Sequence, residues 1–201
     1  MKKSSHKSIK KKTTDEIYDG ISQLVIDDNP ELITINNIAK RSGYSIGNIY
    51  HHFKNIEDVI DTFVSNRIEK RTHVIIDLIE NTHPTQNSTE ILKSYIDINF
   101  EFMRTKLPKK MFLLLAAKVF DKPNVKEKLM ELSIAQARAL EAMIKINKTN
   151  TFKNLTSDEI ELAAIMVGNA IRAPIISNHK LALTKSHQEH SLTILLALLV
   201  K

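Results

Sequence analysis

Residues 34–53 of this chain, TINNIAKRSGYSIGNIYHHF, determine how its first part folds. Thr34 is suited to cap a helix, because its hydroxyl can accept a hydrogen bond from a free N–H group in the first turn. Apolar residues then recur at the i, i+3, i+4 spacing of a helix that buries one face, namely Ile35, Ile38 and Ala39. Gly43 follows, and glycine adopts the positive φ of a tight turn without steric cost. These signals predict a short capped helix that ends in a glycine turn.

A second short helix is predicted directly after this turn. Ser45 is its cap, and Ile46 and Ile49 supply its apolar side. The remaining positions are small or polar, namely Gly47, Asn48, Tyr50, His51 and His52. Two capped helices around a short glycine-containing turn are typical of the helix-turn-helix, whose second helix enters the major groove of DNA. The alternative is an ordinary helical hairpin inside a core.

The stretch from Gly43 to Phe53, GYSIGNIYHHF, closely resembles the TetR/AcrR family pattern, in which a Gly-x-Ser-x-Gly turn and helix run into Tyr-x-His-Phe. The specific resemblance covers residues 11–71. It implies an all-α fold of about nine helices in two domains. Residues 11–71 would form a three-helix helix-turn-helix DNA-binding domain with its recognition motif at 34–53, and residues 72–201 a helical domain for ligand binding and dimerisation. One position departs from the family, because Ile56 stands where a lysine is common. An isoleucine cannot bind the phosphate that this lysine would bind, unless Lys54 replaces it.

The resemblance implies nine DNA-contacting residues: Thr34, Ser45, Ile46, Gly47, Asn48, Tyr50, His51, His52 and Lys54. Tyr50 and His52 would reach phosphate oxygens, and Thr34 and Lys54 would also position the protein without specifying sequence. An asparagine such as Asn48 can pair with adenine through two hydrogen bonds, and an isoleucine can contact a thymine methyl group. Alternatively, Tyr50 or His52 packs against the first helix, predicted at residues 13–28. Lys40 and Arg41 are expected to be solvated.

Composition supports a helical, cytoplasmic protein of one or two domains. The chain has 201 residues with 4 glycines, 5 prolines and 5% aromatic residues, which favours helices over a strand-rich fold. Cysteine is absent, which excludes disulfides and thiolate chemistry and suits a reducing cytosol. The longest apolar runs, at 111–117 and 194–200, are too short to span a bilayer, and the N-terminus lacks the apolar segment of a secretory signal. Neither a cofactor nor a metal is expected.

The formal net charge of +6 comes from one segment. Residues 1–12 contain six lysines and no acid, and the remaining 23 basic residues balance the 23 acidic ones. A lysine-rich arm beside a helix-turn-helix is well placed to meet DNA phosphates and release counterions. A disordered, solubilising tail is the equally weighted alternative.

The remaining sequence predicts further helices and few loops. Helix-breaking or capping residues bound the segments, including Asn29-Pro30, Asn55 and the polar stretch 147–154. The predicted helices span residues 13–28, 55–81, 89–105, 109–120, 121–146, 156–174 and 185–200. The long helix after Asn55 would link the DNA-reading head to the second domain, and Pro174 should kink or end its helix.

The last two helices, 156–174 and 185–200, are expected to form a homodimer interface. The final helix is apolar nearly all round and must be covered on both faces. Small and apolar residues on the preceding helix would allow close approach, namely Ala163, Ala164, Val167, Gly168 and Ile171. His187 and His190 lie three apart, which permits zinc binding, but without further ligands nearby they are expected to be solvated.

The second domain is expected to enclose a mainly apolar effector pocket. Its expected lining is Phe102, Met103, Phe112, Met166 and Asn169, with Asn169 as a lone buried amide that bonds the ligand, a neighbouring helix or the dimer partner. The sequence therefore predicts a ligand-responsive DNA-binding regulator, a repressor that binds a palindromic operator as a dimer and is released by a small apolar molecule. The alternatives are a helical protein-interaction module without a ligand and a helical hydrolase. Enzyme activity is not expected, since no phosphate loop or catalytic-triad motif occurs.

Overall fold

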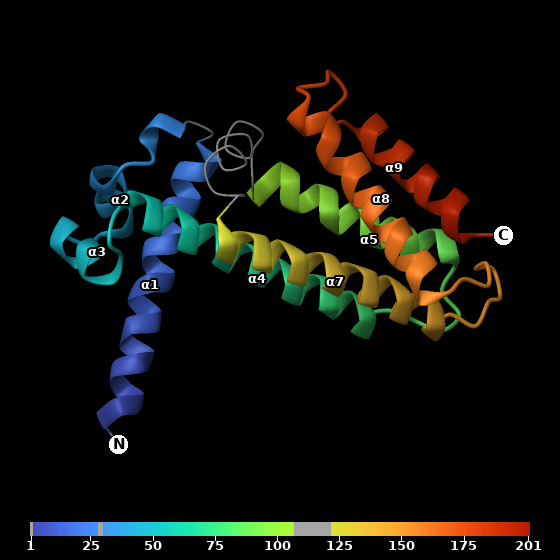
Figure 1. The fold of residues 1–201 in the computed structure, drawn as a ribbon, viewed down its shortest axis with the longest axis horizontal. Helices are drawn as coiled ribbons and strands as arrows, with labels where there is room; N and C mark the ends of the chain where they lie inside the picture. The colour runs from blue at the N-terminus through green and yellow to red at the C-terminus, as the bar shows by residue number, and fades with distance from the viewer. Residues whose placement is uncertain (1, 28–29, 107–121) are drawn as a thin grey trace. The chain divides into compact units, whose positions relative to one another are not determined.

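The structure is a computed structural model that describes residues 2–27, 30–106 and 122–201. Within these residues every regular element is helical, so the expected all-α class is confirmed (Figure 1). Its α-helices in these ranges are α1 (Lys2–Ile26), α2 (Ile35–Ser42), α3 (Ile46–His52), α4 (Ile56–Glu80), α5 (Ser88–Glu101), α7 (Pro123–Ile146), α8 (Ser157–Ile176) and α9 (Lys185–Leu199). The helix expected at 109–120 lies outside the described residues. Across the described ranges, no helix combines the length and apolar character needed to cross a bilayer.

Two helix boundaries differ from the predicted ones by four residues or more, and the others in the described ranges by at most two. α1 begins at Lys2 rather than Thr13, because the lysine-rich segment contains neither glycine nor proline and nothing stops the helix from continuing through it. α5 ends at Glu101 and passes into a π-helical turn, Phe102–Lys106, where a continuous α-helix to residue 105 was expected. The boundaries of α4 and α9 agree with their caps and apolar stripes to within one residue at each end.

The chain divides into two compact units. The first, here called the head, comprises the described residues of Met1–Asn66 and Thr105–Val125, and the second, called the C-terminal unit, those of Arg67–Arg104 and Lys126–Lys201. α4 begins in the head and ends in the C-terminal unit.

A glycine contact positions the first two helices of the head. A Cβ atom added to Gly20 of α1 would lie 2.9 Å from the backbone nitrogen of Ser42 on α2, closer than real Cβ contacts allow. α1 and α2 therefore pack backbone against backbone at this point. The head core around this crossing consists of Ile17, Tyr18, Ile21, Leu24, Val25, Ile38, Ile49, Phe53, Val59 and Phe63, all buried.

The C-terminal unit has its own continuous core, formed by α5, α7, α8 and α9. Its members include Leu92, Tyr95, Ile96, Phe100, Leu140, Met143, Ala163, Ala164, Val167, Ile171, Leu195 and Leu199. This finding corrects the expected dimer interface of α8. The small residues Ala163 and Ala164 pack inside their own unit, because they let α8 approach its intramolecular neighbours, and so they are not available to a partner chain.

His187 bonds a backbone carbonyl of α8 that Pro174 leaves without its helical hydrogen-bond donor. Proline has no N–H group, so the carbonyl of Ala170, four residues earlier, loses its helical partner. The Nε2 atom of His187, on α9, lies 2.9 Å from that carbonyl oxygen, and Nδ1 accepts a hydrogen bond from the backbone N–H of Leu183 at 3.1 Å. His187 is 8% exposed, so the expectation that it is solvated is wrong. Its edge also meets the ring of Phe100 at 4.9 Å between centroids.

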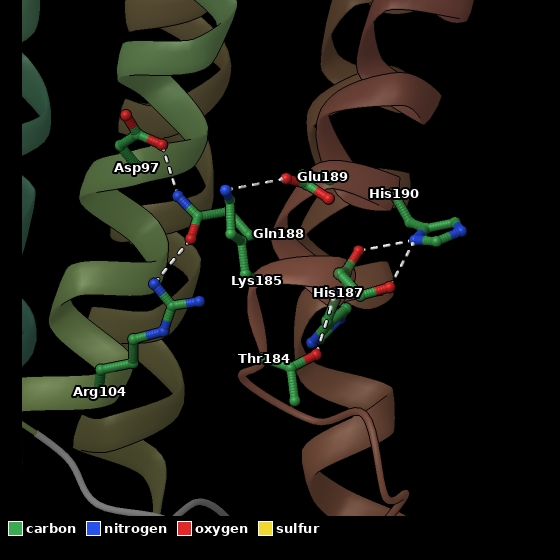
Figure 2. Close-up of polar contacts among 9 residues, drawn as sticks. Asp97, Arg104, Thr184, Lys185, His187, Gln188, Glu189 and His190 are labelled. Atoms are coloured by element: carbon green, nitrogen blue, oxygen red, sulfur yellow. Dashed lines mark hydrogen bonds and ion pairs between the residues drawn. The ribbon is translucent and has the colours of Figure 1, made fainter.

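A polar chain joins α5 to α9 within the C-terminal unit. Figure 2 shows Gln188 between Asp97 and Arg104. The Gln188 amide nitrogen donates to Asp97 at 2.5 Å, and its oxygen accepts from Arg104 at 2.7 Å. Arg104 also donates through Nε to the carbonyl of Leu183 at 2.8 Å. Leu183 has a φ of 63°, so this strained turn before α9 is held by Arg104 on its carbonyl and by His187 on its N–H.

Candidate DNA-binding site

The turn between α2 and α3 is built by short-range capping bonds. The hydroxyl of Thr34 accepts from the N–H of Asn37 at 3.3 Å, as its position before α2 predicted. At the other end, Gly43 adopts a φ of 76°, and its N–H donates to the carbonyl of Ala39 at 3.0 Å. A residue with a Cβ would be strained there, since the left-handed region is costly for L side chains. The turn therefore directs the chain into α3 in one conformation.

α3 is fixed at both ends and along one side. The hydroxyl of Ser45 accepts from the N–H of Asn48 at 3.2 Å, and the N–H of Phe53 closes the last turn on the carbonyl of Ile49 at 2.9 Å. Ile49 is fully buried, and Phe53 is 5% exposed with its ring 6.1 Å from that of Tyr18 on α1. The buried Ile49 and Phe53 therefore anchor α3 in the core of the head.

The opposite side of α3 faces solvent. Ile46 is 44% exposed and Tyr50 is 53% exposed, and Gly47 and His51 are exposed between and beside them. These four residues follow the i, i+1, i+4, i+5 spacing of a single helix face. A large apolar side chain and an aromatic ring held at the surface, on a helix narrowed by a glycine, form a surface suited to a DNA groove.

Two expected contact residues of α3 are less accessible than the sequence suggested. Asn48, expected among the exposed candidates, is half-buried, and its Oδ1 atom is out of contact with solvent and has no hydrogen-bond partner among the described residues. His52 is also half-buried, with its ring edge-on to His51 at 5.5 Å and 6.3 Å from the ring of Phe53. Asn48 is therefore less accessible to a base than its exposed neighbours Gly47 and Tyr50.

The start of α4 uses its own side chains as caps. The Oδ1 atom of Asn55 accepts from the N–H of Asp58 at 2.8 Å, and a carboxylate oxygen of Asp58 accepts from the N–H of Lys54 at 2.8 Å. These two N–H groups are therefore not free to bind a phosphate, because side-chain oxygens already bind them. The side chain of Lys54 and that of Thr34 are exposed, as phosphate contacts require.

Two polar contacts that the sequence did not indicate hold the head together. Arg41, expected to be solvated, donates to a carboxylate oxygen of Asp27 at 2.9 Å. The hydroxyl of Tyr44, in the turn, donates to the carboxylate of Glu16 on α1, and this bond raises the pKa of Tyr44. Only the folded chain brings these pairs together, since neither is close in sequence.

The residues expected to line an effector pocket do not form one buried group. Met103 is 5% exposed and Phe102 is half-buried, whereas Met166 is 45% exposed and Asn169 is exposed. Asn169 accepts a hydrogen bond from Arg172 at 3.1 Å on the surface of α8, so the expectation that it is a buried amide is wrong. Phe112 lies outside the described residues.

A buried amide of the C-terminal unit is Asn99, which is 4% exposed. Its oxygen accepts from Gln136 at 2.9 Å and from the guanidinium of Arg71, and its nitrogen donates to the carbonyl of Tyr95 at 2.7 Å. A sequence signal for this cluster exists: Arg71 interrupts the apolar stripe of Ile68 and Ile75 on α4.

Comparisons with known proteins agree with this architecture. Residues 17–62 match the sequence profile described as bacterial regulatory proteins, tetR family. No functionally curated protein matches the chain in sequence.

Several solved structures share the fold over nearly the whole chain. A protein from Mesorhizobium loti MAFF303099, assigned to the TetR family of transcriptional regulators, is 13% identical, with a TM-score of 0.68 over 96% of this chain and 98% of that one. A TetR-family transcriptional regulator from Agrobacterium tumefaciens is 17% identical, with a TM-score of 0.64 over 92% of this chain and 97% of that one. FadR from Bacillus subtilis, solved in complex with stearoyl-CoA, is 17% identical, with a TM-score of 0.60 over 91% of this chain and 96% of that one.

The matched segment, 17–62, contains α2, the Gly43 turn, α3 and the first turns of α4. These are the elements that hold Ile46, Gly47, Tyr50 and His51 on one exposed face. The resemblance inferred from the sequence is confirmed: residues 17–62 match the N-terminal domain of the TetR family, and the chain shares its fold with TetR-family transcriptional regulators.

Proposed function

We propose that this protein is a homodimeric repressor that binds a roughly palindromic operator and leaves it when a small, largely apolar molecule binds the C-terminal unit. The proposal that the protein binds DNA is supported by the exposed face of α3, which lies opposite the buried Ile49. Such a helix can lie in the major groove, with Ile46 against base edges and Tyr50 against a phosphate oxygen. Among the other expected contacts, Ser45, Gly47 and His51 are exposed on α3 or at its cap, and Thr34 and Lys54 are exposed outside this helix.

Dimerisation is supported by apolar surface on the last two helices. α8 exposes Leu162 at 56%, Ile165 at 43% and Met166 at 45%, and α9 exposes Ile194 at 40%. Leu162, Ile165 and Met166 follow the i, i+3, i+4 spacing of one helix face, and an exposed apolar face favours an interaction with a partner. A two-fold axis through it would present two copies of α3, and a spacing of about 34 Å between them would match successive major grooves. This interface uses the outward face of α8, not the small residues that pack in the core.

An apolar effector is supported by composition and by the fold. The described helices of the C-terminal unit carry many apolar side chains, and FadR from Bacillus subtilis, which shares the fold, was solved with stearoyl-CoA bound. To empty an operator, an effector must favour the non-binding state by several kcal/mol. The ligand of this chain would therefore bind the conformation that does not bind DNA more tightly than the conformation that does.

Selection from a random double-stranded DNA library tests the proposal directly. The wild-type protein should enrich a sequence with two inverted half-sites, and its affinity should fall steeply with rising salt. A variant with Ile46→Glu and Tyr50→Glu is a matched control, because both positions are exposed and the fold should persist. Enrichment of no sequence, or equal enrichment by this variant, would refute the assignment of α3 as the recognition helix.

A further inference from the structure

Three polar residues occupy positions on the inner faces of three helices in the C-terminal unit. Arg71 lies on α4 between the buried Ile68 and Ile75, Asn99 on α5 is 4% exposed, and Gln136 on α7 is 7% exposed. Each falls at the spacing where its helix otherwise buries an apolar side chain. Burying a polar side chain costs free energy unless hydrogen bonds or an opposite charge replace the water that it loses. The bonds made by these three residues therefore have to be accounted for.

Asn99 bonds both other members of this cluster, which consists of Arg71, Asn99 and Gln136. The Asn99 oxygen accepts from both Arg71 and Gln136, and its nitrogen is used on the carbonyl of Tyr95. A neutral amide oxygen that already accepts two bonds orients the guanidinium but does not neutralise its charge. The amide therefore fixes the position of Arg71 and leaves its charge uncompensated.

Arg71 has no acidic partner within the described part of the chain. The residue is half-buried as a whole, but its Nε atom is out of contact with solvent and has no hydrogen-bond partner among the described residues. Its guanidinium lies over the ring of Phe102, 4.3 Å from the centroid. Burial lowers the pKa of Arg71 to about 10, and the charges that act on it are those of Tyr95 and Arg172 rather than of an Asp or Glu. At neutral pH this guanidinium is therefore a desolvated cation with no counterion in the described ranges.

A second cation adds to the positive potential. The charge of Arg172, on α8, acts on Arg71, and burial also lowers the pKa of Arg172. Arg172 donates to Asn169 at the surface end of its side chain, and both arginines act on the buried Tyr95. Two guanidinium groups whose charges act on one buried phenol, with no described carboxylate acting on them, would be stabilised by an anion.

We propose that Arg71, fixed by Asn99 and supported by Arg172, binds the oxyanion headgroup of a small organic ligand whose apolar body contacts the surrounding core. The headgroup is a carboxylate or a phosphate, because both accept two hydrogen bonds from a guanidinium. This inference rests on the proposed function in that the ligand is its effector. It assigns the polar anchor of that effector to Arg71 rather than to the exposed Asn169.

Calorimetry on the wild-type protein tests the headgroup. The anionic probes are linear carboxylates from butanoate to dodecanoate together with octyl phosphate, and 1-octanol and octylamine are the neutral and cationic controls. A carboxylate or octyl phosphate should bind and raise the melting temperature, whereas 1-octanol and octylamine should not. Preference between octanoate and octyl phosphate then identifies which oxyanion the site takes. Equal stabilisation by 1-octanol, or stabilisation by none of the anions, would overturn the proposal.

Variants separate an anion receptor from a structural arginine. Arg71→Met should weaken binding of the anion by at least about tenfold, because it removes a desolvated charge-assisted contact. Without ligand it should melt at the same or a higher temperature, since the unpaired buried charge is gone. A purely structural Arg71 predicts the opposite: a lower melting temperature and unchanged anion binding. Arg138→Met, at an exposed position on α7, is the control and should change neither quantity.

Arg172→Met provides a second measurement if Arg71→Met fails to fold. It should weaken anion binding while the fold persists, because Arg172 is only half-buried, and unchanged affinity in this variant would count against the cluster. Operator binding by the wild-type protein is measured in parallel. Anion binding without operator binding would reject the proposed function alone, and operator binding without anion binding would reject this inference alone.

Discussion

The imidazole of His187 takes the place of a missing backbone donor next to Pro174. Its Nε2 atom lies 2.9 Å from the Ala170 carbonyl oxygen, which would otherwise be an unpaired acceptor in the helix. Because Nδ1 accepts from the N–H of Leu183, Nε2 carries the proton, and the neutral tautomer is defined. One side chain thus joins α8, α9 and the strained turn between them.

We expect His187→Ala to lower the free energy of unfolding by about 2–4 kcal/mol, because it leaves a buried carbonyl unsatisfied and opens a cavity. In a Pro174→Ala background the loss should be smaller, since the introduced alanine would supply an N–H group to the carbonyl of Ala170. Urea unfolding of the four proteins of this cycle, at one protomer concentration, measures the coupling. His190→Ala, at an exposed position on the same helix, is the control. Additive effects of the two substitutions would contradict this account.

Gly20 and Gly47 should respond in opposite ways to alanine. Gly20→Ala places a Cβ 2.9 Å from the backbone of Ser42 and should destabilise the head by about 1–3 kcal/mol. Gly47 has only the Ser45 hydroxyl oxygen nearby among the described atoms, at 4.0 Å, so Gly47→Ala should stabilise α3 by up to about 1 kcal/mol. It should nevertheless weaken operator binding, because the new methyl group lies on the exposed face. Thermal unfolding and gel-shift titration of both variants separate these effects, and a tolerated Gly20→Ala would argue against the tight crossing.

Contacts to phosphates and to bases should be distinguishable. Tyr50→Phe removes one hydrogen bond to phosphate and should cost about 1 kcal/mol on every duplex tested. His52→Ala should behave in the same way if its tip reaches phosphate, but its half-burial adds a loss of stability. Asn48→Ala should chiefly relax sequence preference, by about 1–3 kcal/mol at one base pair. Binding to the selected operator and to its single-base variants measures all three, and a uniform loss for Asn48→Ala would remove it from base recognition.

Charge on the outward face of α8 should break the dimer. Leu162→Glu and Met166→Glu introduce carboxylates on exposed apolar positions, so the monomer should fold while the dimer dissociates. Met130→Glu, at a 61% exposed position on α7, is the matched control. Sedimentation velocity should show a wild-type dimer at micromolar concentration, a monomer for the α8 variants and a dimer for the control. A monomeric wild type would reject the interface.

The lysine-rich start of α1 should contribute to the salt dependence of DNA binding. Deletion of residues 2–12 removes six lysines, and the slope of log affinity against log salt should fall by about 0.9 for each phosphate that these lysines neutralise. Operator affinity measured from low to high salt gives this slope. An unchanged slope would show that the segment does not contact DNA.

Short-range signals in the sequence determined the helices and the candidate site. Thr34, Ser45 and Thr156 each accept a hydrogen bond from a backbone N–H three residues later, and Gly43 adopts the positive φ that its place in the turn required. Such contacts involve only neighbouring residues, so composition and spacing specify them. For the same reason the exposed face of α3 could be predicted from the buried position of Ile49.

Only the tertiary structure decided which polar and apolar residues lie inside the C-terminal unit. α8 is apolar on two faces, and spacing cannot show that Ala163 is buried while Met166 is exposed, since that depends on where α5 and α9 pack. In the same way, His187 is buried where it bonds a carbonyl that a proline on another helix leaves without its helical partner. Asn99 is buried, unlike Asn169, where Arg71 and Gln136 bond it from two other helices. These contacts join residues distant in sequence, and their partners are known only when the helices are packed.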